Sequence, residues 1–251
     1  MENKLKAARK AIMNSSYLVC LQGHNTSTDC GCLDYRDPNI SFDIEERYGY
    51  ASEEMFNTSF YNTRPEKFFK YYKEILEHTG TPGEGVLALA ELEKQGILKC
   101  TITREIFSLA RRGGCKNVVE LHGSVFHNQC SHCKKEYPLE YVKNAKGLPA
   151  CEKCHKVIRP QVCLVGEQVD NALITRAAEE VEKADVLLLV GCTMAQKLAT
   201  THLKYFGGSK VVLINTEEHY SDTRADIVIY GTISEILPKI IHGESEDSEK
   251  V

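Results

Sequence analysis

Four cysteines and a histidine between residues 120 and 159 have the types and spacing to carry chemistry. Cys130 and Cys133 form one Cys-x-x-Cys pair, and Cys151 and Cys154 form a second pair. Two such pairs at this separation are typical of a four-thiolate zinc site, which is closed to water and stabilises the fold. The alternatives are four unrelated reduced thiols or a redox dithiol, and the matched second pair disfavours the redox reading. We expect one structural zinc ion per chain.

His122 lies just upstream of these cysteines, in the segment Glu120–Ser124. Imidazole ordinarily titrates near neutral pH, so a histidine here has the chemistry of a general base. The alternative is a histidine whose hydrogen bonds are satisfied at the end of a strand. His132 and His155 adjoin the cysteine pairs. Because four thiolates already complete a zinc shell, we expect both to be exposed loop residues rather than ligands.

The composition of the chain excludes several classes of protein. The 251 residues carry a net charge of −4, so there is no excess of Lys and Arg of the kind that binds nucleic acid. No run of 18 apolar residues appears, so no membrane span is expected. Seven of the 11 cysteines are scattered among apolar runs rather than arranged as a disulfide scaffold, which favours a reducing, cytoplasmic compartment. Four of them, Cys20, Cys100, Cys163 and Cys192, are expected to be buried.

The pattern of apolar runs predicts alternating strands and helices over most of the chain. Helices are predicted at the N-terminus and over residues 85–95 and 233–241. Strands are predicted over residues 17–22, 97–102, 117–121, 184–190, 210–215 and 226–230. Continuous apolar runs such as 184–190 are typical of central parallel strands. The alternation therefore predicts an α/β fold, a doubly wound parallel sheet with ligands at the carboxyl ends of its strands.

Two segments interrupt this alternation. Residues 40–82 are rich in aromatic side chains at helical spacing, and residues 124–158 hold the zinc pairs. We expect these to form a smaller inserted domain, helical and zinc-binding. The predicted large domain comprises residues 1–39, 83–123 and 159–242, and residues 243–251 are a predicted disordered acidic tail.

A set of motifs along almost the whole chain resembles the sirtuins, a family of NAD-dependent protein deacylases. The segment 115–124, the two cysteine pairs, Arg159–Val162 and Gly166–Glu167 match the family in order and spacing. Further similarity is found in residues 31–36 to the family's GIPDFR, in 190–193 to VGTS and in 213–217 to LINxE. No single motif is specific, but the set is.

The resemblance implies a Rossmann-like large domain and a small zinc domain, with NAD and an acylated lysine peptide meeting in the cleft between them. In that reaction nicotinamide leaves, the acyl group ends on ADP-ribose, and a histidine takes a proton from a ribose hydroxyl. His122 stands at the position of that histidine, and Glu105 at that of an asparagine which orders the ribose and a water molecule. The implied NAD-binding residues are Gly23, His24, Asn25, Ser27, Asp34, Tyr35, Arg36, Thr103, Arg104, Gly191, Cys192, Thr193, Asn215, Glu217 and Ile233. The implied peptide-binding residues are Val162, Val165, Gly166 and Glu167.

The chain departs from the sirtuin pattern in its NAD-binding loops. Residues 23–27 read GHNTS where the family has GAGIS, and 103–107 read TREIF where it has TQNID. Asn25 tolerates positive φ better than most residues, so we expect a turn of that kind to persist there. His24 adds an imidazole beside the expected phosphate path, where it either obstructs or binds phosphate. Phe107 removes a hydrogen-bonding group, and Val165 replaces a phenylalanine and is expected to widen the acyl-lysine tunnel.

These features lead to one expected function and two alternatives. The expected function is NAD-dependent protein-lysine deacylation, weak or specialised because of the altered loops. The first alternative is another NAD-consuming reaction, ADP-ribosyl transfer or NAD hydrolysis. The second is a non-catalytic protein that binds NAD, ADP-ribose or an acylated peptide.

Overall fold

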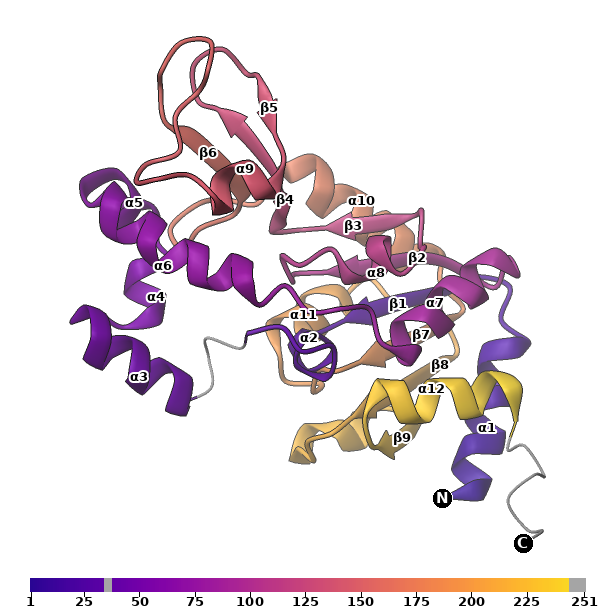
Figure 1. Cartoon of the computed structure of the whole chain (residues 1–251). Coiled ribbons are helices and arrows are strands. Elements are labelled where there is room, and N and C mark those ends of the chain that lie inside the picture. The colour runs from indigo at the N-terminus through magenta and orange to yellow at the C-terminus, as the bar shows by residue number, and fades with distance from the viewer. Residues whose placement is uncertain (34–37, 244–251) are drawn as a thin grey trace, which may run out of the picture.

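The computed structural model describes residues 1–33 and 38–243, and its larger part is a six-stranded parallel sheet (Figure 1). The strand order is β3-β2-β1-β7-β8-β9. The strands are β1 (Leu18–Gln22), β2 (Leu98–Thr103), β3 (Val118–Glu120), β7 (Val186–Val190), β8 (Lys210–Asn215) and β9 (Ile227–Tyr230). All six predicted strands are present, with ends shifted by no more than two residues. The chain reverses its winding direction between β1 and β7, which are paired neighbours.

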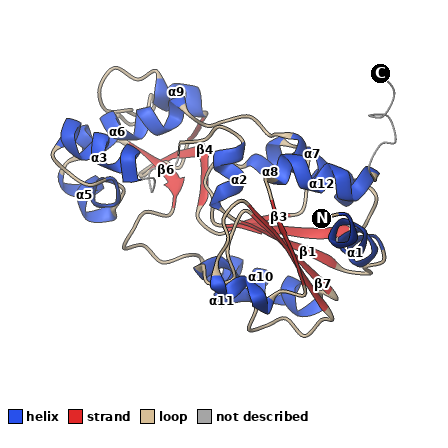
Figure 2. Cartoon of the chain, turned by 90° about the horizontal axis from the view of Figure 1, so that it is seen from below, coloured by secondary structure: helices blue, strands red, loops and turns tan. Residues whose placement is uncertain are grey.

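Helices cover both faces of this sheet (Figure 2). On one face lie α1 (Glu2–Met13), α7 (Glu84–Lys94) and α12 (Ile233–His242), and on the other lie α10 (Asn171–Lys183) and α11 (Lys197–His202). Successive residues of a strand point to opposite faces, so Leu188 packs with the first group and Leu189 with the second. The predicted doubly wound α/β fold is confirmed. Shorter elements at the sheet edges are α2 (His24–Asp29), α8 (Leu109–Arg112) and a 3-10 helix, η1 (Tyr220–Arg224).

The two interrupting segments pack against each other beside the sheet (Figure 1). The first forms α3 (Pro38–Tyr48), α4 (Ser52–Met55), α5 (Thr58–Thr63) and α6 (Pro65–Glu77). The second contributes β4 (Gly123–Cys130), β5 (Glu136–Tyr137) and α9 (Leu139–Lys143), and β4 pairs antiparallel with β5 and with β6 (Ile158–Val162). One hydrophobic cluster joins them: Phe68 and Tyr72 of α6 stack at 5.5 Å between ring centroids, in a cluster that also includes Val125 and Ile158. The exact domain boundaries remain a prediction.

Two further expectations concern the ends and surface of the chain. Residues 244–251 of the predicted tail lie outside the described residues. Among the helices of the described residues, none combines the length and apolar character needed to cross a membrane.

Candidate active site

The four predicted zinc ligands converge at the end of the small sheet. Their sulfur atoms all lie within 4.8 Å of one another, with Cys130 Sγ 3.4 Å from Cys154 Sγ and Cys133 Sγ 3.5 Å from Cys151 Sγ. A tetrahedral shell with Zn–S bonds of about 2.3 Å has S···S edges of about 3.8 Å, so the four thiols fit zinc. The predicted metal site is consistent with this cluster. His132 and His155 are exposed outside it, as expected.

Backbone conformation brings the thiols together. The residues that follow each pair, Lys134 and His155, have positive φ of 63° and 57°. This turn lets the N–H groups of Lys134 and His155 donate to the carbonyls of Cys130 and Cys151, at 3.2 and 2.8 Å. The Tyr137 hydroxyl also donates to Cys151 Sγ over 3.1 Å, which favours the thiolate that a metal requires. The cluster lies at the far end of β4 from His122, and its four thiols leave no open position for a substrate, which fits a structural metal.

The other predicted residues follow the carboxyl ends of neighbouring strands of the large sheet. Arg104 and Glu105 follow β2, Gly23 follows β1, Gly191 follows β7, and Asn215 ends β8. Parallel strands present these ends at one edge, so the residues follow one another across neighbouring strands β2, β1, β7 and β8. The reversal between β1 and β7 lies in the middle of this line, where ligands of doubly wound folds bind.

Two glycines allow β1 and β7 to approach closely at this edge. A Cβ atom on Gly23 would lie 2.4 Å from the carbonyl oxygen of Gly191, and one on Gly191 would lie 2.5 Å from the amide nitrogen of Thr26. Gly191 also has φ +63°, which favours glycine. The Gly23 N–H donates to the Val190 carbonyl (2.8 Å) and the Asn25 N–H to the Gly191 carbonyl (3.0 Å). The ends of β1 and β7 therefore meet through direct backbone hydrogen bonds at this edge of the sheet.

The expected positive-φ turn at Asn25 is wrong. Asn25 lies inside the short helix α2 and is not among the described non-glycine residues with positive φ. Its side chain instead donates to Asn215 Oδ1 (3.0 Å) and Thr216 Oγ1 (3.3 Å), across the sheet edge. Helix formation from His24 onward satisfies the backbone without the special conformation that glycine supplies. Asn25, Gly191, Asn215 and Ile233 line one small recess.

The residues after β2 are held by a hydrogen-bonded chain. The Thr103 hydroxyl donates to the Gln22 carbonyl (2.9 Å) and accepts from the Glu105 N–H (3.0 Å). Ser27 Oγ lies 3.4 Å from Glu105 Oε2 and donates to it. Thr103 and Ser27 are both buried, so they position Glu105 rather than present a free hydroxyl. Glu105 lines a cavity of about 310 Å³ at this edge of the sheet.

His122 lies where two cavities meet. The larger, about 710 Å³, runs between the sheet edge and the small domain, and the smaller is about 310 Å³. Arg104, His122 and Lys197 line both. His24 lines only the smaller one, beside Gln22 and Gly23. The Arg104 guanidinium donates from Nε to His122 Nε2 over 3.0 Å. A candidate base is thus placed between a space at the carboxyl edge of the large sheet and a second space near the small domain.

The predicted peptide-binding residues line the larger cavity or adjoin it. Val162 is buried at the end of β6, and its partner in the sheet is Gly123, next to His122. Val165 is 57% exposed, while its backbone N–H and carbonyl bond to Phe56 and Thr58 of the helical segment, both at 3.0 Å. Gly166 has φ +91°. The loop therefore presents an apolar side chain to the cavity from a fixed backbone.

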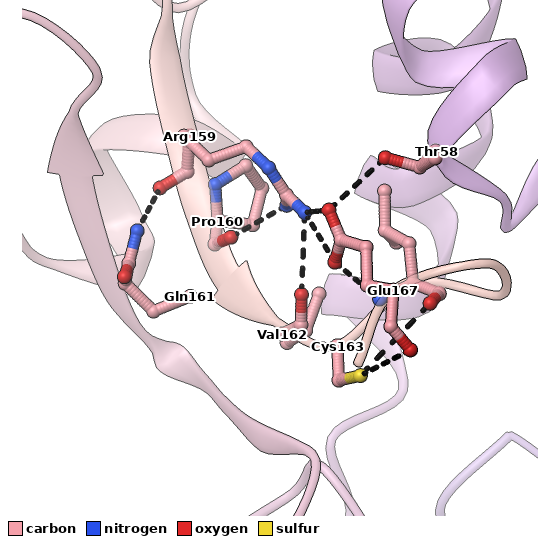
Figure 3. A network of polar contacts seen from close by, with 8 residues as sticks. Thr58, Arg159, Pro160, Gln161, Val162, Cys163 and Glu167 are labelled. Carbon is pink, nitrogen blue, oxygen red and sulfur yellow. Dashed lines mark hydrogen bonds and ion pairs between the residues drawn. The ribbon is translucent and has the colours of Figure 1, made fainter. Parts of the chain in front are cut away.

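Glu167 fixes this loop from within. Its carboxylate accepts from Arg159 Nη2 at 2.6 and 2.8 Å, from the Leu164 N–H at 2.8 Å and from the Thr58 hydroxyl at 3.0 Å (Figure 3). Burial raises the pKa of Glu167, but these donors and the Arg159 charge outweigh it and leave the pKa below its ordinary value. The Glu167 carboxylate therefore holds the loop of residues 162–167 in place.

Several predicted residues do not reach the cavities. Cys192 is fully buried, and burial raises its pKa to about 12, so it contributes no charge to the site. Thr193 is buried beside it, and Glu217 is exposed beyond β8. Phe107 is buried in the hydrophobic cluster of the small domain. The predicted NAD-binding residues Asp34, Tyr35 and Arg36 lie outside the described residues.

The expected burial of Cys163 is wrong. β6 ends at Val162, so Cys163 lies in the following loop, half-buried on the wall of the larger cavity. Its N–H donates to the His122 carbonyl (2.9 Å), which ties the loop of residues 162–167 to the segment of the candidate base. Cys20, Cys100 and Cys192 are buried as expected.

Other residues of the cavity walls were not predictable from the sequence. Lys197 and His202 at the two ends of α11 line the larger cavity, as do Phe56 and Ile106. Burial lowers the pKa of His202, and the charge of Arg104 lowers it further, so its imidazole favours the neutral form. No spacing in the sequence connects α11 with residues 104–122. Only the crossover that returns the chain beside β1 brings them together.

Comparison with known proteins agrees with this geometry. The sequence model of the Sir2 family matches residues 23–197. The chain is 35% identical over 243 residues to the NAD-dependent protein deacetylase of Clostridium perfringens, covering 96% of this chain and 100% of that protein. It is 32% identical over 237 residues to NAD-dependent protein deacylase 1 of Archaeoglobus fulgidus, covering 92% and 94%.

Solved structures agree as well. A Sir2 homologue in complex with NAD superposes with a TM-score of 0.82 at 32% identity, covering 96% of this chain and 93% of that one. A second structure, solved to explain sirtuin substrate affinity, has a TM-score of 0.84 at 27% identity and coverage of 96% and 99%. The protein combines a Rossmann-like parallel sheet with an inserted module whose four cysteines fit a zinc ion. The chain belongs to the Sir2 family.

Proposed function

We propose that this protein is an NAD-dependent protein-lysine deacylase of sirtuin type, with His122 as the general base. The observation that carries the proposal is the position of His122 between the two cavities, next to both the dinucleotide edge and the peptide loop. NAD, when bound, supplies the ribose carbon to which the acyl oxygen becomes attached as nicotinamide leaves. His122 would take the proton of a ribose hydroxyl at Nε2, the ring nitrogen that already faces a donor.

The large sheet fits NAD at its carboxyl edge. The Gly23–Gly191 approach would seat the dinucleotide backbone, and the recess of Asn25, Asn215 and Ile233 would take its adenosine end. His24 would adjoin the phosphate path from the wall of the smaller cavity. Glu105, held by Ser27 and Thr103, would accept hydrogen bonds from ribose hydroxyls.

The larger cavity fits an acylated lysine. Phe56, Ile106, Leu164 and Val165 would give an apolar lining for the lysine stem and acyl chain, and His122, which follows β3 of the large sheet, lines the same cavity. The loop of residues 162–167 would offer its backbone to an extended peptide. Cys130, Cys133, Cys151 and Cys154 would hold the structural zinc that keeps β4 and β6 in place beneath this loop.

One experiment separates this function from the alternatives. The protein is incubated with NAD and an acetylated lysine peptide, and nicotinamide, peptide mass and protein mass are followed together. Equal amounts of nicotinamide and deacylated peptide support the proposal. Nicotinamide release with an unchanged peptide would indicate NAD hydrolysis, or ADP-ribosyl transfer if the protein mass rises. NAD binding with no turnover would indicate a non-catalytic binder.

A further inference from the structure

Arg104 and His122 contact each other at the edge of the sheet. Arg104 follows β2 and His122 follows β3, and these strands are parallel partners with Thr103 opposite Glu120. The register therefore brings the two side chains to the same place, and Nε of Arg104 lies 3.0 Å from Nε2 of His122. Both side chains are half-buried, so water screens this contact less than it would at the surface.

The chemistry of the two groups decides which nitrogen carries the imidazole proton. A guanidinium has only donors and stays protonated in proteins, so Nε2 of His122 has to accept. His122 is consequently neutral in this arrangement, with its proton on Nδ1. In the imidazolium form both ring nitrogens are donors, and the contact would become a clash between two donors and two positive charges. The hydrogen bond thus selects one tautomer of one protonation state.

That tautomer is the one a general base needs here. The lone pair on Nε2 accepts from Arg104, and both residues line the two cavities in which a ribose hydroxyl and an acylated lysine would meet. The charge of Arg104 also reaches a second imidazole on this wall, because it contributes to the lowered pKa of buried His202. Arg104 therefore acts on the electrostatics of the site as well as on one hydrogen bond.

We propose that Arg104 is a positioning residue for His122, which it holds as the neutral Nδ1–H tautomer until a ribose hydroxyl of NAD takes its place at Nε2. The inference rests on the proposed function for its catalytic consequence, but its structural content concerns the protein without ligands. It changes the role predicted for Arg104 from direct contact with NAD to preparation of the base. Because the Arg104 N–H occupies Nε2, NAD binding and release of the base are coupled.

The test compares the wild type with two variants. Arg104→Met keeps an unbranched side chain that reaches about as far as Nε but removes the charge and the donors, and Arg104→Lys keeps a positive donor. Long-range ¹⁵N–¹H spectra of the histidine rings are recorded on the ligand-free proteins at about pH 8.5, where neutral imidazole predominates. The His122 signals are assigned by their loss in His122→Asn. Zinc content and thermal unfolding confirm that each variant is folded.

The wild type is expected to carry the His122 proton on Nδ1. Arg104→Met is expected to shift it toward Nε2, and Arg104→Lys to retain most of the wild-type pattern. With NAD and acetyl peptide, Arg104→Met should lower kcat between about threefold and tenfold, the value of one hydrogen bond, without raising the KM for NAD. A wild-type proton on Nε2, or a tautomer unchanged in Arg104→Met, would overturn the proposal. So would a raised KM for NAD at constant kcat, which assigns Arg104 to NAD binding. The spectra keep their meaning if no variant turns over, so failure of the proposed function is recognised separately.

Discussion

Replacing Glu167 by glutamine tests whether the peptide loop is held by the carboxylate network of Figure 3. The variant keeps the shape of the side chain but places an amide NH₂ among donors from Arg159, Leu164 and Thr58. The side chains of Arg159 and Glu167 are 18% and 30% exposed, between the exposed and the buried class of ion pair. Exposed pairs contribute about 0–1 kcal/mol, and breaking a buried pair costs about 3–5 kcal/mol. We expect a loss of about 2 kcal/mol at pH 7, roughly a 30-fold change in the unfolding constant.

The effect of Glu167→Gln on the unfolding free energy should depend on pH. The pKa of Glu167 in the folded protein lies below the ordinary value of 4.5. The contribution of the carboxylate is therefore complete above pH 4.5 and is lost as the pH falls through the lower folded pKa. The difference in unfolding free energy between wild type and Glu167→Gln should shrink over that range, and loss of zinc in acid affects both proteins alike.

The assay is urea unfolding of both proteins at a series of pH values, with the KM for an acetylated peptide as a second readout. Glu235→Gln is the matched control, because Glu235 pairs with Lys239 at 3.0 Å on the surface, with side chains 59% and 45% exposed. We expect it to cost under about 0.5 kcal/mol. The reasoning is refuted if Glu167→Gln costs no more than the control, or if its cost is the same at pH 7 as in acid.

Three further predictions follow from the described geometry. Protein purified without added zinc should contain one equivalent of zinc. Cys151→Ser should lose the zinc together with the thermal stability of the small domain. A wild-type zinc content well below one equivalent would contradict this prediction. Gly23→Ala should destabilise the protein by about 2 kcal/mol or more and weaken NAD binding, because the new Cβ atom would lie 2.4 Å from the Gly191 carbonyl oxygen. Calorimetry measures both effects. A stable variant that binds NAD normally would be inconsistent with a close approach of β1 to β7. Val165→Phe should lower the KM for an acetylated peptide about threefold, because Val165 is 57% exposed on the cavity wall and the larger side chain would cover more of the lysine stem. An unchanged KM would show that residue 165 does not contact the acylated lysine.

The parts of the fold that depend on local pattern were predictable from the sequence. Continuous apolar runs such as 184–190 and 210–215 are sufficient to identify buried parallel strands, and both are found in the centre of the sheet. The spacing of the two cysteine pairs predicted that their four sulfur atoms lie together, because one zinc ion needs all four as ligands. The position of the candidate site at the carboxyl ends of the strands was predictable from the alternation of strands and helices.

The features that depend on tertiary contacts were not predictable in this way. Asn25 was expected in a positive-φ turn because the family has glycines nearby, yet a helical start satisfies the same backbone and directs its amide to Asn215. The burial of Cys163 was misjudged because the apolar run continues past the last paired residue of β6. The Arg104–His122 hydrogen bond joins the ends of two neighbouring strands, and nothing in the spacing of the two residues indicates it.

The most direct test of the account follows the acyl group itself. A peptide carrying a ¹³C-labelled acetyl-lysine is incubated with NAD and either the wild type or His122→Asn, and the small-molecule products are analysed by mass spectrometry. We predict that the wild type forms one labelled acetyl-ADP-ribose for each nicotinamide released, and that His122→Asn forms essentially none while still binding NAD. Free labelled acetate without acetyl-ADP-ribose, or equal product from His122→Asn, would contradict His122 as the base of an NAD-dependent deacylase.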